Sequence, residues 1–447
     1  MIVEIYIGER LMNKLKPSRY NIIINENSDT LAFNSKNCAM AKVDNDFIDI
    51  LNNPNSEMTK EKISLREKMY NVGFLVDEAV DEIKLLRLRQ TQQHFNSNSL
   101  NITILPTDAC NFSCFYCFEH KKEIRMSKQT QEETIKFIES MLDGYRALNI
   151  AWFGGEPLLS ADIIWDMSDK LMAIADKRSC EYNAYMITNG FIINDAIIEK
   201  MHKYKIKRLQ ITLDGDEAAH NKRRCTKSGG ETFNKIIENI KKLISNDYKI
   251  SCRVNIDKSN ANTVNTLIKR LALELGEKKN SLQISFGQIL PIARLDEWDS
   301  SVCLSMEEYS ALIDEYMQCM IENGFVIQDD YPFYPTPKAN FCSSVQLNTF
   351  VVRPNGTIDK CWDCESMPVG NVHDGLAYNT TTEYNLAKWV AWDVLADEEC
   401  KNCRVLPLCM GSCPYFSMVL KKKHCLKWKF DIEKIVKQKY NRHLEGK

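Results

Sequence analysis

The clearest hydrophobic pattern lies in the middle of the chain, where short apolar runs alternate with longer amphipathic stretches from residue 100 to residue 324. Short apolar runs that end at glycine, proline or polar turn residues are typical of buried strands. The pattern predicts strands over residues 101–105, 150–153, 185–188, 209–213, 251–256 and 282–286.

Between these runs, apolar residues recur at the spacing of a helix that buries one face. The pattern predicts helices over residues 128–142, 162–175, 195–202, 232–244, 263–275 and 306–322. The fourth helix has the most continuous apolar face, which consists of Phe233, Ile236, Ile237, Ile240, Leu243 and Ile244.

Strict alternation of strands and helices predicts parallel strands joined by helical crossovers. Six such units predict an α/β fold, a partial (β/α)6 TIM barrel. Because ligands of parallel sheets bind at the carboxyl ends of the strands, the residues that follow each strand are the candidate site. Cysteine, glycine and polar residues cluster at five of these ends, at residues 110–117, 154–157, 188–190, 214–215 and 255–257.

The two ends of the chain have different patterns from the middle. In the first part, strands are predicted at residues 2–7, 20–24 and 73–76, and helices at residues 44–51, 60–70 and 78–89. These elements predict a winged-helix-like domain over residues 1–95, followed by the barrel over residues 96–328. After Pro332, Pro335 and Pro337 the chain becomes rich in cysteine, which predicts a third domain over residues 329–447. A hairpin is predicted there at residues 354–356, Pro-Asn-Gly.

Composition narrows the function classes. The chain has 447 residues, 44% of them hydrophobic, and a formal net charge of −2, which favours globular domains and does not indicate a general nucleic-acid binder. No apolar run approaches the ~18 residues of a membrane-spanning helix, and the first residues lack the features of a secretory signal. We therefore expect a cytoplasmic protein, in which most of a cysteine cluster serves as metal ligands rather than disulfides.

Three cysteines, Cys110, Cys114 and Cys117, follow the first barrel strand with the spacing C-x3-C-x2-C. A structural zinc site usually has four protein ligands, whereas a [4Fe–4S] cluster held by three thiolates leaves one iron open. The alternatives are three unrelated loop thiols or three ligands of a split zinc site.

This loop, with an aromatic residue before its third cysteine, resembles the radical S-adenosylmethionine (SAM) superfamily, and the sequence Gly-Gly-Glu-Pro at residues 154–157 resembles its second signature. The resemblance implies that SAM binds the open iron and is cleaved by one electron, and that the resulting 5′-deoxyadenosyl radical removes a hydrogen atom from the substrate. It also implies that the Glu156 carboxylate accepts hydrogen bonds from the SAM amino group. The implied SAM contacts are Tyr116, Gly154, Gly155, Glu156, Asn189, Arg224 and Asn255, with Arg223, or a plain basic loop, as alternatives to Arg224.

Eight cysteines lie between residues 342 and 425, in the pattern C-x13-G-x4-C, a gap, C-x2-C-x5-C-x3-C, a gap, and C, with one cysteine outside this pattern. The pattern resembles the SPASM domain, which holds two auxiliary [4Fe–4S] clusters. The resemblance implies that the first cluster uses Cys342, Cys361 and Cys413, and that the second uses Cys400, Cys403, Cys409 and Cys425. We expect the extra cysteine, Cys364, to close the first cluster, although an open iron there and a pair of zinc sites are alternatives.

Residues 1–95 are similar in length and element order to the peptide-binding unit called a RiPP recognition element. The combined resemblance implies a maturase of ribosomally made peptides, similar to sactipeptide, ranthipeptide and cyclophane-forming enzymes, with three [4Fe–4S] clusters and SAM. We expect the leader of a precursor peptide to bind by strand addition, and flavodoxin or ferredoxin to donate electrons. The product would carry a thioether, carbon–carbon or carbon–oxygen crosslink. The alternatives are an anaerobic sulfatase-maturase-like enzyme and a non-catalytic iron–sulfur carrier or scaffold. No catalytic base can be assigned.

Overall fold

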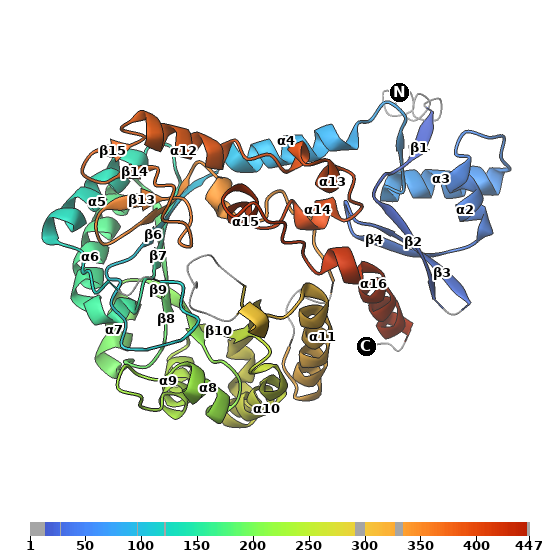
Figure 1. Cartoon of the computed structure of the whole chain (residues 1–447). Coiled ribbons are helices and arrows are strands. Elements are labelled where there is room, and N and C mark those ends of the chain that lie inside the picture. Colours follow the sequence, from blue (N-terminus) through green and yellow to red (C-terminus); the bar gives the residue numbers. More distant parts are fainter. Residues whose placement is uncertain are drawn as a thin grey trace.

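A computed structural model describes residues 14–26, 28–95, 97–119, 122–290, 300–326 and 334–444. The strand predicted at residues 2–7 lies outside these ranges. The described chain forms a curved parallel sheet with helices on its outer side, a cysteine-rich region that continues one edge of that sheet, and a small N-terminal unit joined to them by a long helix (Figure 1). None of the described helices is long and apolar enough to cross a membrane.

Six parallel strands form the centre of the sheet, in the order β11-β10-β9-β8-β7-β6. They are β6 (Ser99–Ile104), β7 (Ala147–Trp152), β8 (Glu181–Thr188), β9 (Ile206–Thr212), β10 (Lys249–Ile256) and β11 (Leu282–Gln288). Each overlaps a predicted strand, so the prediction of an α/β fold with a large parallel sheet is confirmed. Because the strands are parallel, all their carboxyl ends lie at one edge.

The crossover helices are α5 (Lys128–Met141), α6 (Ala161–Lys177), α7 (Asp195–Lys203), α9 (Phe233–Ser245), α10 (Val264–Leu275) and α11 (Met306–Glu322). They match the predicted helices within three residues at each end. The apolar face predicted on α9 is fully used, because none of its six residues is more than 4% exposed. A short helix that was not predicted, α8 (Glu217–Arg223), follows β9. The stretch considered a plain basic loop is therefore partly helical.

The cysteine-rich region does not fold apart from the sheet. Its first strand, β12 (Thr349–Val352), pairs in parallel with β6, and β13 (Thr357–Asp359), β14 (Gly370–Asn371) and β15 (Gly375–Leu376) follow as antiparallel neighbours. The predicted hairpin joins β12 to β13, and Gly356 has the positive φ of 85° that such a turn requires. The helices after it are α12 (Thr380–Val390), α13 (Glu398–Lys401), α14 (Leu406–Cys409), α15 (Pro414–Met418) and α16 (Trp428–Leu444).

The N-terminal unit contains more strands than its sequence predicts. A three-stranded antiparallel sheet consists of β2 (Asn21–Glu26), β3 (Asp29–Asn34) and β4 (Ala39–Val43), and β1 (Leu15–Pro17) pairs with β5 (Leu75–Asp77). The helices are α2 (Asn45–Asn52), α3 (Lys60–Val72) and α4 (Glu82–Phe95). The predicted helix at residues 78–89 thus begins four residues later and extends farther.

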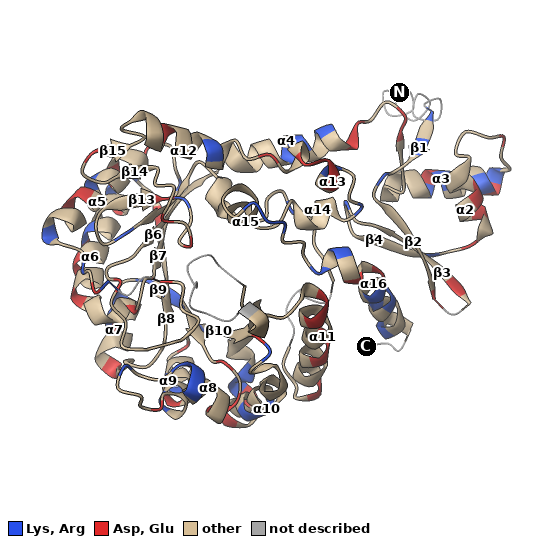
Figure 2. Cartoon of the chain, in the orientation of Figure 1, with Lys and Arg blue, Asp and Glu red and all other residues tan. Residues whose placement is uncertain are grey.

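This unit packs against the C-terminal end of the chain. Apolar residues of β2 and β3 share one buried core with Ile432, Ile435 and Val436 of α16. The Tyr440 hydroxyl donates to Asp29 at 2.5 Å. On its other side, α16 contacts α11, where Lys434 pairs with Asp314 at 2.5 Å. Figure 2 shows basic residues spaced along α16 and acidic residues along α11. The N-terminal unit and the cysteine-rich region are therefore joined by a buried apolar contact.

The remaining short elements are 3-10 helices. They are η1 (Pro157–Ser160), η2 (Ala261–Thr263), η3 (Gly276–Ser281), η4 (Ser300–Val302), η5 (Ser343–Val345) and η6 (Val394–Ala396).

Candidate active site

The loop with Cys110, Cys114 and Cys117 follows β6 and is fixed through its backbone. Ser113 N–H donates to the Cys225 carbonyl and Lys227 N–H donates to the Asn111 carbonyl, both at 2.9 Å. The segment after α8 thus pairs with the middle of the cysteine loop. All three cysteines are partly exposed residues, and their loop lies at the carboxyl edge of the sheet because it follows β6.

Two glycines after β7 allow this loop to lie directly on the next strand end. A Cβ on Gly154 would lie 2.4 Å from the Thr107 carbonyl oxygen, and a Cβ on Gly155 would lie 2.4 Å from two loop carbonyl oxygens. Glu156 N–H donates to the Ala109 carbonyl at 2.8 Å. The two glycines therefore let the backbone after β7 lie close to the backbone of the cysteine loop.

Glu156 itself is completely buried. Its carboxylate accepts hydrogen bonds from the Thr188 hydroxyl at 2.8 Å, Leu158 N–H at 3.1 Å and Asn189 N–H at 2.7 Å. Burial raises the pKa of this carboxyl, and the three donors oppose that rise. The three donors join the ends of β7 and β8, and the predicted contact of Glu156 with a SAM amino group stays a prediction.

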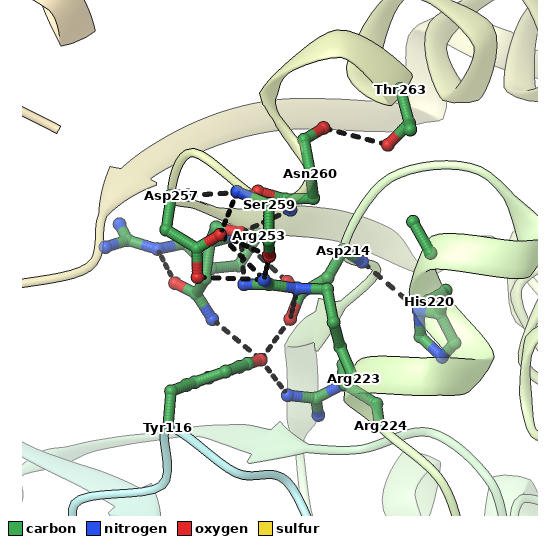
Figure 3. Close-up of polar contacts among 12 residues, drawn as sticks. Tyr116, Asp214, His220, Arg223, Arg224, Arg253, Asp257, Ser259, Asn260 and Thr263 are labelled. Atoms are coloured by element: carbon green, nitrogen blue, oxygen red, sulfur yellow. Dashed lines mark hydrogen bonds and ion pairs between the residues drawn. The ribbon is translucent and has the colours of Figure 1, made fainter. Parts of the chain in front are cut away.

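A buried polar network connects the cysteine loop with the ends of β9 and β10 (Figure 3). At its centre, the Tyr116 hydroxyl donates to Asp214 and accepts from Arg224 at 2.6 Å and from Asn255 Nδ2 at 3.4 Å. Burial raises the Tyr116 pKa well above its usual value, and the Asp214 charge adds to that rise. Three of the predicted SAM contacts thus meet at one hydroxyl group.

Arg223 and Arg224, which the sequence offers as alternative SAM contacts, have different surroundings. Arg223, 3% exposed, donates to both Asp257 oxygens at 2.9 and 2.8 Å, and its Nε lies 3.7 Å from Asp214. Arg224, 8% exposed, donates to Tyr116 and forms no ion pair within the described part of the chain. The Nε atoms of both arginines are buried without a hydrogen-bond partner there. Arg223 therefore neutralises buried carboxylates of the fold, whereas the charge of Arg224 is not paired with a carboxylate of the chain.

Two network residues, Asp214 and His220, were not among the predicted SAM contacts, although residues 214–215 were predicted to lie at the site edge of the sheet. Asp214 also accepts from Asn255 N–H at 3.0 Å, and its own N–H donates to His220 Nδ1 at 3.1 Å. His220 is fully buried, and burial followed by the charges of Arg224 and Arg223 holds its pKa well below the usual value. The signal that locates Asp214 is its position at the end of the fourth strand. The last predicted contact, Asn189, lies beside the loop and donates from Nδ2 to Asn111 at 2.7 Å.

The cysteine loop meets the β12–β13 hairpin at a seam of carboxylates and aromatic rings. Burial raises the pKa of Asp108 to about 6 and that of Glu119 to about 8, and the Arg353 charge opposes both rises. Across the seam, the Phe153 ring lies 6.4 Å from the Phe118 ring and 5.4 Å from the Trp362 ring, measured between centroids. Phe118 follows Cys117 and Trp362 follows Cys361, so the two cysteine-bearing segments face each other here.

The cysteines of the C-terminal region fall into two groups. Burial raises the pKa of Cys361 well above its usual value, and the neighbouring Cys342 and Cys413 thiols contribute, so these three lie together. Cys364 is 2% exposed, and its Sγ lies 3.6 Å from the Ser366 hydroxyl. The predicted role of Cys364 as a further cluster ligand stays a prediction.

The second group lines one pocket. Its lining includes Cys400, Cys403, Cys409 and Cys425, with Leu406 and Leu426 as apolar wall and Glu399, Lys423 and Lys429 beside them. Among the described residues, no three His, Cys, Asp or Glu side chains are arranged to hold a metal ion. A [4Fe–4S] cube binds each thiolate through a different iron, so its cysteines surround a space rather than converge on one ion. The four-cysteine pocket has that form.

Comparison with known proteins agrees with this geometry. Residues 104–271, from the end of β6 into α10, match the model of the radical SAM superfamily. These residues form a radical SAM domain, and the protein is an enzyme. Membership of this superfamily implies one [4Fe–4S] cluster and SAM. The three-thiol loop beside the Tyr116–Arg224 network fits that pair of ligands, because three thiolates would leave one iron of the cluster open on the same edge as Arg224, which forms no ion pair among the described residues.

Several curated relatives are similar over most of the chain. A radical SAM cyclopropyl synthase, TigE from Paramaledivibacter caminithermalis, is 21% identical over 437 residues, which cover 89% of this chain and 89% of TigE. A cysteine-type anaerobic sulfatase-maturating enzyme from Clostridium perfringens is 23% identical over 341 residues, or 70% of this chain and 88% of that enzyme. The relatives of this radical SAM enzyme thus include a cyclopropyl synthase and a sulfatase-maturating enzyme.

Two solved structures show the same fold. That of anSMEcpe with bound AdoMet has a TM-score of 0.58 and 19% identity, and covers 77% of this chain and 98% of that chain. That of Streptococcus suis SuiB bound to its precursor peptide SuiA has a TM-score of 0.53 and 13% identity, and covers 92% of this chain and 97% of SuiB.

Proposed function

We propose that this radical SAM enzyme abstracts a hydrogen atom from a ribosomally made precursor peptide and forms an intramolecular crosslink, either a thioether or a carbon–carbon or carbon–oxygen bond. The observation that carries the proposal is a combination of two features. One is a three-thiol loop beside Arg224, which forms no ion pair among the described residues, and the other is similarity to TigE across 89% of the chain. The similar fold of SuiB, which was solved with a precursor peptide, supports the same substrate class.

In this proposal Cys110, Cys114 and Cys117 hold the cluster of the radical SAM domain. Bound SAM supplies, after one-electron cleavage, the radical that removes hydrogen from the peptide. Arg224 donates to the SAM carboxylate, with Asn255 and Tyr116 in the same network. Gly154, Gly155 and Glu156 fix the cysteine loop against the ends of β7 and β8. They are also proposed to make the remaining polar contacts with SAM. Asn189 braces the loop from β8 through Asn111.

Residues 329–447 are proposed to form a SPASM domain with two auxiliary [4Fe–4S] clusters. The neighbouring thiols Cys342, Cys361 and Cys413 would hold the first cluster, with Cys364 as its fourth ligand. The four-cysteine pocket would hold the second cluster. The seam at Trp362 lies between the cysteine loop and the group of Cys342, Cys361 and Cys413. A peptide bound at this seam would be close to the cluster of the radical SAM domain and to the first auxiliary cluster.

The N-terminal unit is proposed to bind the leader of the precursor as a RiPP recognition element. At one edge of its sheet, β4 pairs only with β3 among the described strands, and four of its five residues are partly exposed. The opposite strand, β2, is engaged by the C-terminal helix, since Lys437 and Asn441 contact Glu26. A leader strand is therefore proposed to pair with β4.

The function is tested with the peptide encoded by a small open reading frame beside the gene, co-expressed with the enzyme under anaerobic conditions. Mass spectrometry should show a loss of two hydrogens per crosslink, and purified enzyme with flavodoxin or ferredoxin should convert SAM to 5′-deoxyadenosine. A reduced, cluster-loaded enzyme that makes no 5′-deoxyadenosine with this peptide would contradict the proposal.

The leader site is tested with a matched pair of proline variants, Met40→Pro and Ala41→Pro. Successive N–H groups of an edge strand point alternately to the neighbouring strand and outward. Only the variant that removes an outward N–H should keep the melting temperature while it weakens leader binding, measured by fluorescence anisotropy, by about tenfold. Unchanged leader affinity in both folded variants would place the leader elsewhere.

A second candidate is oxidation of one Cys or Ser in a protein substrate, as the names of the sulfatase-maturating relatives describe. This candidate is favoured by the sulfatase-maturating enzyme from Clostridium perfringens, whose similarity covers 70% of this chain. The N-terminal unit discriminates, because leader-dependent turnover is expected only of a peptide maturase. A non-catalytic iron–sulfur carrier or scaffold would give no SAM turnover at all. Auxiliary zinc in place of iron would show in metal analysis of anaerobically purified protein.

A further inference from the structure

Tyr20 is a buried residue of the N-terminal unit with an unused hydroxyl group. It lies directly before β2 and has 0% exposure. Its backbone carbonyl accepts from Ser35 N–H at 3.1 Å, but its hydroxyl is buried with no hydrogen-bond partner in the described residues. A buried hydroxyl without a partner is unfavourable, so its retention needs a reason.

The surroundings of Tyr20 belong to the other end of the chain. Its ring packs in one apolar cluster with residues of α4, η6 and α14, and Cys400 and Cys403 pack against the same cluster. Leu406 belongs both to this cluster and to the wall of the four-cysteine pocket. Tyr20 therefore lies behind one wall of that pocket, although it is separated from Cys403 by more than 380 positions in the sequence.

The charges near Tyr20 favour a hydroxyl that keeps its proton. Burial raises its pKa to about 12, and the Glu82, Asp81 and Cys403 groups add to this while Arg19 opposes it. A neutral phenol is a hydrogen-bond donor. Two other thiols of the pocket already have N–H groups near them, because Lys429 Nζ lies 3.7 Å from Cys425 Sγ and the backbones of Leu426 and Gly411 donate to Cys409.

We propose that the Tyr20 hydroxyl donates a hydrogen bond to the sulfur of Cys403 when the four-cysteine pocket holds its cluster. This inference rests on the auxiliary cluster proposed above. Tyr20 is a positioning residue, which does not touch substrate. Because a donor to a cluster sulfur stabilises the more negative, reduced state, this hydrogen bond raises the reduction potential of the second auxiliary cluster. The N-terminal unit thus completes a redox site of the C-terminal region.

The test is a redox titration of the full-length, anaerobically reconstituted enzyme, followed by electron paramagnetic resonance, for wild type and Tyr20→Phe. At a fixed potential, the ratio of reduced to oxidised second cluster should fall about tenfold, which is about 59 mV toward negative potential for one electron. The matched control is Tyr182→Phe, which removes a tyrosine hydroxyl from β8 that is 3% exposed and has a similarly raised pKa. It should leave the potential unchanged.

A second readout separates the hydrogen bond from a packing role. In cluster-free protein the Tyr20 hydroxyl has no partner, so Tyr20→Phe should not lower the melting temperature there. A melting temperature lowered equally with and without clusters, or an unchanged potential in a variant of full iron content, would overturn the proposal.

A further variant tests whether the four-cysteine pocket holds an auxiliary cluster at all. A Cys400→Ala, Cys409→Ala variant should lose iron, and Tyr20→Phe should have no further effect on the remaining potentials in that background. If the double variant keeps the full iron content, the second cluster is absent and both proposals are wrong. If iron is lost but Tyr20→Phe leaves the wild-type potential unchanged, only the Tyr20 proposal is wrong.

Discussion

The enzyme carries two cysteine sites built on opposite principles. At the sheet edge, three thiols lie beside a buried network of charged side chains that extends over three strand ends. In the C-terminal pocket, four thiols lie between apolar walls, and the charged residues are exposed at the rim. A site with three thiols and buried polar donors can accept a ligand from outside the chain, whereas four thiols complete the coordination of a cluster.

The energetic consequences of the two designs differ as well. Arg223 and Asp257 are both at most 3% exposed, and removal of one partner from such a pair leaves a buried charge without compensation. At the pocket rim, Lys423 and Glu399 are about half exposed, where ion pairs stabilise little. The sheet edge should therefore be sensitive to single substitutions, and the rim tolerant.

The largest effect is expected at the sheet-edge site, from the loss of one of its three cysteines. Cys114→Ala should reduce 5′-deoxyadenosine formation at least about a thousandfold, because the proposed cluster loses one of only three ligands. Iron content should fall by about a third. The control is Cys180→Ala, since this buried thiol donates to the Tyr145 carbonyl at 3.0 Å and lies in no cysteine group. SAM cleavage that survives Cys114→Ala would contradict the assignment of this loop.

The next effect divides the two neighbouring arginines. Arg223→Gln should lower the free energy of unfolding by about 3–5 kcal/mol, measured by denaturant titration, because Asp257 and Asp214 remain buried without their cation. Arg224→Gln breaks a hydrogen bond but no ion pair, so it should lower that energy much less. It should nevertheless raise the Kd of SAM about 10- to 100-fold, because one charge-assisted contact is lost. If both variants behave alike, the distinction drawn from the ion pairs of Arg223 is wrong.

A smaller effect is expected in the first auxiliary group. Cys364→Ser should change the spectrum of that cluster and reduce its iron content, while Ser366→Ala, which removes only the neighbouring hydroxyl, should not. Unchanged iron content and spectrum in Cys364→Ser would mean that the cluster keeps an open iron. The first auxiliary site would then resemble the sheet-edge site rather than the four-cysteine pocket.

The part of this architecture that the sequence predicts is the part with strong local periodicity. Residues 232–244 repeat apolar residues at helical spacing, and the structure buries them as predicted. Strand β4 was not predicted, because its sequence, Ala-Met-Ala-Lys-Val, shows no clear alternation of apolar and polar residues. Its extended conformation is stabilised by pairing with β3. Similarly, nothing local in β12 shows that it pairs with β6, because that pairing joins residues about 250 positions apart.

The same distinction applies to the candidate site. The cysteine spacing and the polar residues at strand ends locate the sheet-edge site, because parallel strands bring their carboxyl ends together. The separate roles of Arg223 and Arg224 could not be predicted, since the side chains of adjacent residues reach different partners only in the folded chain. The carboxylates at the seam, Asp108 and Glu119, depend likewise on an arginine more than 200 residues away.

The smallest effect tests the pocket rim. Glu399, which is about half exposed, accepts from Lys423 at 2.7 Å and from Lys429, and these two contacts lower its pKa to about 2. A folded-state pKa below the unfolded value gives stability that is present above the unfolded pKa, ~4.3, and that is lost as the pH falls through about 2. Glu399→Gln in cluster-free protein should therefore lower the melting temperature only slightly at neutral pH, and not at all at low pH or high salt. The control is Glu398→Gln, which removes only a contact with Lys401 within one helix. A loss as large as that in Arg223→Gln would remove the contrast, because the rim would then hold the pocket together as strongly as the buried pair holds the sheet edge.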